Sequence, residues 1–291
     1  MVMWRDIQAN DGEKIAYQTH GEEKSMVLIL IHGFTGSSDY FQRNFEALSQ
    51  KYFVVAPDLR GHGKSTKAHH GYHVSRLAAD LRDLLAHISR SDIQLSSHES
   101  PSIIGVGCSL GAAVLWSYSE LFGTEPFSGM VFVDQAPLQD YIPGSWDFKQ
   151  GNYGVHDPTS LAAAQATLKY APEDFYRGLV HGCLAYNHEP TESERDSISP
   201  LQKAKDESFF IYISKNGNPW WFGKLLADHT SYDHRNTIMN LIRVPTFVMA
   251  GRRSGSFPVD GVLETAYLAN SHSTSPGTVS TIVMDSGHCQ S

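Results

Sequence analysis

The sequence has little cysteine, no long hydrophobic run and no excess of basic residues. It contains 3 cysteines in 291 residues, which excludes a disulfide-rich secreted scaffold. The longest apolar run, residues 26–31, is far too short to span a bilayer, and the first residues (MVMWRDIQ) lack a signal-peptide segment. Acidic residues outnumber basic ones, 31 to 23, so binding to nucleic acid is not expected. We therefore expect a cytoplasmic enzyme without a membrane span.

Short apolar runs alternate with amphipathic segments at both ends of the chain. This alternation, with short connections, predicts a mostly parallel sheet with helices on both faces. Strands are expected at residues 26–31, 52–56, 102–107, 130–134, 244–250 and 279–284, after an early hairpin formed by 4–9 and 14–19. Helices are expected at residues 38–50, 75–88, 110–122 and 260–269.

The middle of the chain lacks this alternation. Its one strand-like run is FFIYI at residues 209–213, and the rest has helical patches and many aromatic residues. We interpret residues 138–237 as an inserted, mainly helical cap, and residues 1–137 and 238–291 as an α/β core.

A strand–turn–helix context surrounds the sequence GCSLG at residues 107–111. A GxSxG motif in this context is typical of a nucleophile elbow, whose tight turn lifts the serine clear of the sheet. The glycines on either side of Ser109 allow the backbones to approach, and the following helix N-terminus favours developing negative charge. Cys108 is disfavoured as the nucleophile because Val106 and Leu110, two residues away from it, are too large for the elbow.

A glycine-bearing loop, HGFTG at residues 32–36, follows a predicted buried strand. The backbone N–H groups of Phe34 and Leu110 are candidate donors to the oxygen of a tetrahedral intermediate. Two converging donors form an oxyanion hole, which stabilises the transition state of acyl transfer. The alternative is an ordinary loop that needs glycine for its backbone conformation.

The segment PDLRGHGKS at residues 57–65 does not have the spacing of a phosphate-binding loop, so nucleotide binding is not expected. We interpret it as a structural loop with an internal Asp/Arg network. The nearby His69, His70 and His73 lack the thiol or carboxylate partners of a metal site, so we expect no metal and no cofactor.

His288 follows the last expected strand, in the sequence DSGH at residues 285–288. The chain resembles the α/β-hydrolase superfamily over nearly all of its length outside the cap. The resemblance rests on four motifs in this order: HG after a strand, PDLRGHGKS, GxSxG and a late GH. The resemblance implies the α/β-hydrolase fold, with Ser109 as nucleophile and His288 as its general base. Chemistry supports the same roles, because a serine hydroxyl needs a positioned imidazole to take its proton.

The acidic partner of the histidine departs from the usual pattern of the superfamily. The acid usually follows the strand after the cap in a GxxD sequence, but residues 251–254 here read GRRS. Some members, pancreatic lipases and fungal lactonases among them, place the acid after the strand before the cap. Asp134 stands at that place and is our predicted acid, followed by Asp260 and then Asp233.

Aromatic residues of the cap are candidates for contact with substrate: Trp146, Trp220, Trp221 and Phe222. They can line an apolar pocket under a lid, or equally they can form the cap's own core. His229 is expected to be a buried structural histidine.

These residues together predict a serine hydrolase that cleaves a small ester or lactone through an acyl-enzyme. Rival functions on the same site are cofactor-free perhydrolysis, amide hydrolysis and C–C bond hydrolysis. A different class of function is a receptor-like member that binds a small molecule with weak or no turnover. The last strand lies near the end of the sequence, and a second subunit could cover its apolar surface, so a homo-oligomer is a further expectation.

Overall fold

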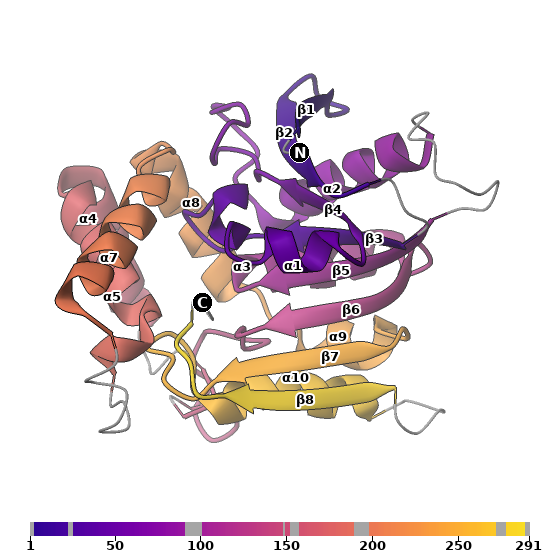
Figure 1. The fold of residues 1–291 in the computed structure, drawn as a ribbon. Helices are drawn as coiled ribbons and strands as arrows, with labels where there is room; N and C mark the ends of the chain where they lie inside the picture. Colours follow the sequence, from indigo (N-terminus) through magenta and orange to yellow (C-terminus); the bar gives the residue numbers. More distant parts are fainter. Residues whose placement is uncertain are drawn as a thin grey trace.

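The structure, a computed structural model, describes residues 3–22, 26–90, 101–147, 149–151, 157–188, 198–271 and 278–288. Within these residues the chain forms one eight-stranded sheet with the strand order β1-β2-β4-β3-β5-β6-β7-β8 (Figure 1). The strands are β1 (Met3–Gln8), β2 (Lys14–His20), β3 (Met26–Ile31), β4 (Phe53–Pro57), β5 (Ser102–Cys108), β6 (Phe127–Val133), β7 (Thr246–Gly251) and β8 (Val279–Met284).

The sheet is mostly parallel, as the sequence predicted. Strands β1 and β2 form the predicted antiparallel hairpin, β2 pairs antiparallel with β4, and the pairs from β4 to β8 are all parallel. Parallel strands place their carboxyl ends at one edge of the sheet, so the segments after β3, β5 and β6 come together there.

Helices cover both faces of this sheet. The helical elements are η1 (Ser38–Phe41), α1 (Phe45–Ser49), α2 (Val74–Arg90), α3 (Leu110–Phe122), α4 (Pro158–Tyr170), α5 (Pro172–Cys183), η2 (Ala185–Asn187), α7 (Pro200–Ser214), α8 (Pro219–Ser231), α9 (Arg235–Leu241) and α10 (Val259–Asn270). Alternate residues of β3 explain the two layers: Ile29 packs with the core beneath α2 and α3, whereas Leu30 packs with Phe41 and Phe45 on the other face.

The predicted face of α2 is confirmed, because the apolar residues at helical spacing are all buried: Leu77, Leu81, Leu84, Leu85 and Ile88. The continuous helix expected at residues 38–50 is wrong. The chain forms η1 and then α1, because Gln42 and Asn44 donate their backbone N–H groups to residues three positions earlier.

The strand-like run at residues 209–213 lies inside helix α7. Ser199 caps this helix by accepting a hydrogen bond from the backbone N–H of Gln202, and Pro200 occupies its first turn. Phe210 and Ile213, at a spacing of three residues, are buried, while Tyr212 between them is exposed. Tertiary packing therefore overrides the strand preference of this run.

Between β6 and β7, the described residues form helical elements, loops and an isolated β-bridge between Ile142 and Trp146. Helices α4, α5 and α7 lie together beyond the carboxyl ends of the strands, at the left of Figure 1. They therefore face the edge of the sheet at which β5 and β6 end. The boundaries of the cap at residues 138 and 237 stay a prediction.

Candidate active site

Ser109 lies in the strained turn that the GxSxG motif predicts. It connects β5 to α3 with φ 51° and ψ −122°, a backbone conformation that a residue with a side chain rarely adopts. The turn is tight because a Cβ on Gly107 would overlap the backbone of Gly111, and one on Gly111 would overlap that of Ile31. The close approach of β5, α3 and β3 therefore requires both glycines.

Asp134 and His288 lie in direct contact at the same edge of the sheet. His288 Nδ1 and Asp134 Oδ2 are 2.6 Å apart, and the aspartate is fully buried. The second carboxylate oxygen accepts a hydrogen bond of 2.8 Å from the backbone N–H of Gly251. Gly251 opens the GRRS segment, so the place where the superfamily usually carries its acid instead contributes a backbone donor to Asp134. Ser254 at the end of that segment accepts hydrogen bonds from the backbone N–H groups of Ser256 and Phe257.

The other two acid candidates lie in different surroundings. Asp260 is exposed in the first turn of α10, and Asp233 forms an ion pair of 2.8 Å with Arg235. Of the three carboxylates considered, the structure brings Asp134 to His288.

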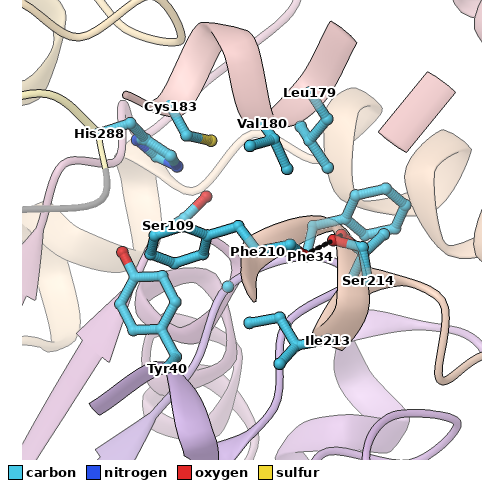
Figure 2. Close-up of a pocket in the computed structure, with 13 residues that line it drawn as sticks. Phe34, Tyr40, Ser109, Leu179, Val180, Cys183, Phe210, Ile213, Ser214 and His288 are labelled. Carbon is cyan, nitrogen blue, oxygen red and sulfur yellow. Dashed lines mark hydrogen bonds between the residues drawn. The ribbon is translucent and has the colours of Figure 1, made fainter. Parts of the chain in front are cut away.

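The His288 ring contacts Asp134 through Nδ1 and lies beside Ser109. A carboxylate can only accept a hydrogen bond, so a neutral His288 ring paired with it carries its hydrogen on Nδ1 and keeps the lone pair on Nε2. Figure 2 shows the Ser109 hydroxyl pointing toward the His288 ring. Burial alone would lower the pKa of His288, but the Cys183 sulfur and the Asp134 carboxylate outweigh it and raise that pKa above its ordinary value.

Cys108, the disfavoured nucleophile, is buried beneath the turn. Burial raises the pKa of its thiol to about 12, so the reactive thiolate is scarce at neutral pH. Cys108 and Cys183 are both buried, and Cys289 lies outside the described residues.

Phe34 and Leu110 lie on either side of Ser109. Leu110 is the first residue of α3, so its N–H has no acceptor within the helix. Phe34 lies in the loop after β3, where a Cβ on the neighbouring Gly33 would be 3.1 Å from Ser109 Cβ. Thr35, with φ 58°, continues this tight loop. Their use as oxyanion donors stays a prediction.

Two cavities meet at Ser109 and His288. The narrow cavity has a volume of about 60 Å³, and its walls come from the loop after β3 and from helices α5 and α7 (Figure 2). The wide cavity has a volume of about 320 Å³, and its walls come mainly from α4, α5, α8 and the loop after β7.

None of the four aromatic residues predicted to contact substrate lines either cavity. Trp146 is buried and donates its indole N–H to the Leu138 carbonyl. Trp220 is 46% exposed, and Trp221 stacks on Tyr72 with ring centroids 5.3 Å apart.

Phe222, the last of the four, is buried against Phe34 and His62. Contact of these four side chains with substrate therefore stays a prediction.

Sequence reasoning missed the residues that form the narrow cavity on α5 and α7: Leu179, Val180, Cys183, Phe210, Ile213 and Ser214. Their spacing is that of any core-facing helix, so no signal in the sequence separates them from packing residues. His229 is buried as predicted and lies 2.9 Å from the Gln139 amide nitrogen, but it also lines the wide cavity.

Comparison with known proteins assigns the chain to a family. A family model described as alpha/beta hydrolase fold matches residues 26–288, so the chain belongs to the α/β-hydrolase fold family. It is 31% identical to the non-heme chloroperoxidase CPO-A1 of Kitasatospora aureofaciens over 251 residues, which cover 86% of this chain and 81% of that protein.

Solved structures share the fold. An esterase from Exiguobacterium antarcticum aligns with a TM-score of 0.77 at 20% identity, covering 98% of this chain and 92% of the esterase. A bromoperoxidase from Bacillus anthracis aligns with a TM-score of 0.78 at 18% identity, covering 98% and 93%. The family supports a hydrolase function without defining the bond that is cleaved.

No helix in the described part of the chain is long and apolar enough to cross a membrane.

Proposed function

We propose that this protein is a serine hydrolase that cleaves a carboxylic ester or lactone of a small, largely apolar substrate. The observation that carries the proposal is the 2.6 Å contact between His288 and the buried Asp134, beside a serine held in a strained turn. A serine, a histidine and a carboxylate in this relation are the groups that acyl transfer through a covalent intermediate requires.

In the first half-reaction, Ser109 Oγ attacks the substrate carbonyl carbon while His288 Nε2 takes the hydroxyl proton. The N–H groups of Phe34 and Leu110 stabilise the resulting oxyanion. The intermediate collapses by breaking the bond to the alcohol oxygen, which receives the proton from His288, and the acyl group stays on Ser109. Asp134 stabilises the transient imidazolium.

In the second half-reaction, a water molecule attacks the acyl carbon while His288 takes a proton from it. The bond to Ser109 Oγ then breaks, and the proton returns from His288 to the serine. The products are a carboxylic acid and an alcohol, which are joined in one hydroxy acid when the substrate is a lactone. The mainly apolar walls of the two cavities support a largely apolar substrate.

The similarity to a non-heme chloroperoxidase favours perhydrolysis as a second candidate function. Hydrogen peroxide would then take the place of water on the acyl-enzyme. One peroxide oxygen bonds to the acyl carbon, its proton passes through His288 to Ser109, and a peracid leaves. Amide and C–C bond hydrolysis would use the same acyl-enzyme, and a receptor-like member would not form it.

The proposal is tested first by the intact mass of the protein after treatment with a fluorophosphonate, with Ser109→Ala as the control. We expect one adduct on the native protein and none on the variant. Turnover of p-nitrophenyl acetate and peracid formation from acetate and hydrogen peroxide then separate the two candidate reactions. A folded protein that forms no adduct would overturn both and leave small-molecule binding.

A further inference from the structure

The two cavities at Ser109 differ in size, walls and access. Both include Phe34, Ser109, Leu179 and His288, so a substrate carbonyl at Ser109 extends one side into each cavity. The volumes of about 60 and about 320 Å³ differ about fivefold, so the two cavities can hold substrate groups of different size.

The narrow cavity is mainly apolar, and none of the residues that line it is exposed. Val180 of α5 and Phe210 and Ile213 of α7 are each less than a tenth exposed. The one hydroxyl of its wall on α7 is already satisfied, because Ser214 Oγ accepts from Thr35 Oγ1 at 3.1 Å and donates to the Phe210 carbonyl at 2.9 Å. The cavity therefore favours a short hydrocarbon chain.

The wide cavity reaches the surface and carries polar groups. Its rim includes Asp174 and Gly178, which are exposed on α5. Deeper in its wall lie Gln139 and His229, each about 5% exposed and hydrogen-bonded to one another. This cavity offers a path to solvent and a polar surface.

The order of the two half-reactions decides which part of the substrate occupies which cavity. The leaving group must depart before water attacks, so it needs the cavity with a path to solvent. The acyl group stays bonded to Ser109 until water attacks and can occupy the narrow cavity, whose walls contain no exposed residue. The narrow cavity, at about 60 Å³, has about a fifth of the volume of the wide one, so it limits the length of an acyl chain that it can hold.

We infer that the narrow cavity is the acyl site and that Val180, Phe210 and Ile213 limit this enzyme to short acyl chains, while the wide cavity holds a larger leaving group. This inference rests on the proposed ester hydrolysis. It names the substrate class as esters of short-chain carboxylic acids.

The test is kcat/KM for p-nitrophenyl acetate, butyrate and octanoate, which share one leaving group. For the native protein we expect octanoate to fall at least about tenfold below butyrate, because the longer chain has no space. Ile213→Ala opens the narrow cavity and should raise the octanoate-to-butyrate ratio about tenfold. Val180→Ala, from the other helix, should raise the same ratio and provides a second variant if the first is poorly folded.

Leu226→Ala is the matched control. Leu226 is equally buried but lines only the wide cavity of the two, so its truncation can change the overall rate and should leave the ratio within about twofold. A native enzyme that prefers octanoate, or a ratio that rises in Leu226→Ala but in neither narrow-cavity variant, would overturn the inference. No hydrolysis of any of the three esters would instead overturn the proposed function, and the inference with it.

Discussion

The backbone conformation of Asp134 determines which groups its carboxylate contacts. Its φ of 47° and its full burial direct one oxygen to His288 and the other to the Gly251 N–H. A carboxylate after β7 is not needed, because the strand before the cap already delivers one to the same imidazole.

We therefore expect Asp134→Asn to lower kcat/KM about 10³- to 10⁴-fold with the fold intact, since an amide cannot stabilise the imidazolium as a carboxylate does. Asp260→Asn changes an exposed side chain of α10 and should leave kcat/KM within about twofold. Steady-state kinetics on the ester that the native protein cleaves fastest, with circular dichroism of each variant, makes the comparison. The reverse result would show that Asp134 is not the acid.

The pH dependence of kcat/KM gives a second prediction at His288. Only the neutral imidazole accepts the serine proton, so kcat/KM should rise with pH and level off above the pKa of His288. Because that pKa is raised, the inflection should lie above the ordinary histidine value of about 6.5. In Asp134→Asn the inflection should move to lower pH, since the carboxylate that favours the charged ring is gone. An inflection that stays in place in this variant would contradict the assigned pair.

At the level of elements, the loop after β4 is held by a buried arginine. Arg60 is fully buried, and its guanidinium contacts Asp80 of α2 at 2.7 Å and Asp11 of the hairpin turn at 2.8 Å. The sequence predicted an Asp/Arg network inside residues 57–65, but the partners of Arg60 come from other elements. Asp58 instead accepts the backbone N–H groups of Ser38 and Lys64.

Asp80→Asn should destabilise the protein by about 3 kcal/mol, because it removes one of the two carboxylates that compensate a buried guanidinium. Asp11→Asn should cost less, since the Asp11 side chain is 25% exposed and water can replace part of its role. Urea unfolding followed by fluorescence measures both. Equal losses in the two variants would mean that burial does not determine the strength of these pairs.

Periodicity predicted the elements of the core because their burial follows local patterns. The continuous apolar run of β3 indicates a strand that is buried on both faces, and the spacing of apolar residues in α2 indicates which side of that helix is buried. The structures of segment 38–50 and run 209–213 were not predicted correctly. Turn hydrogen bonds determine the first, and helix capping contributes to the second. In the sequence, the signals for such turns and caps are weaker than the pattern of apolar residues.

Across the whole molecule, Ser109, Asp134 and His288 could be predicted and the cavities could not. Each of these three follows a strand of a parallel sheet, so chain order alone brings them to one edge. The cavity walls depend on how α5 and α7 dock over that edge. Helical spacing leaves the docking angle open, so the sequence could not indicate that none of the predicted aromatic residues lines either cavity.

Burial of neutral histidine makes the cooperative unfolding of the molecule sensitive to acid. His234, at the start of α9, lies between Trp116 and Tyr232, and neither ring nitrogen has a hydrogen-bond partner among the described residues. Burial lowers its pKa to about 4. As pH falls below about 6.5, His234 binds a proton in the unfolded chain but not in the folded protein. The free energy of unfolding therefore decreases until the pH reaches about 4.

His234→Phe should remove this loss, because phenylalanine fills the same space without titrating. Over the interval from pH 7 to pH 4, the native protein should lose about 3 kcal/mol more unfolding free energy than the variant. Urea unfolding at several pH values measures the difference. The same substitution at the exposed His69 is the matched control and should leave the native slope unchanged. If unfolding free energy depends on pH equally in the native protein and in His234→Phe, another group causes the acid sensitivity. His32 and His62 would then be tested next, since burial lowers the pKa of both.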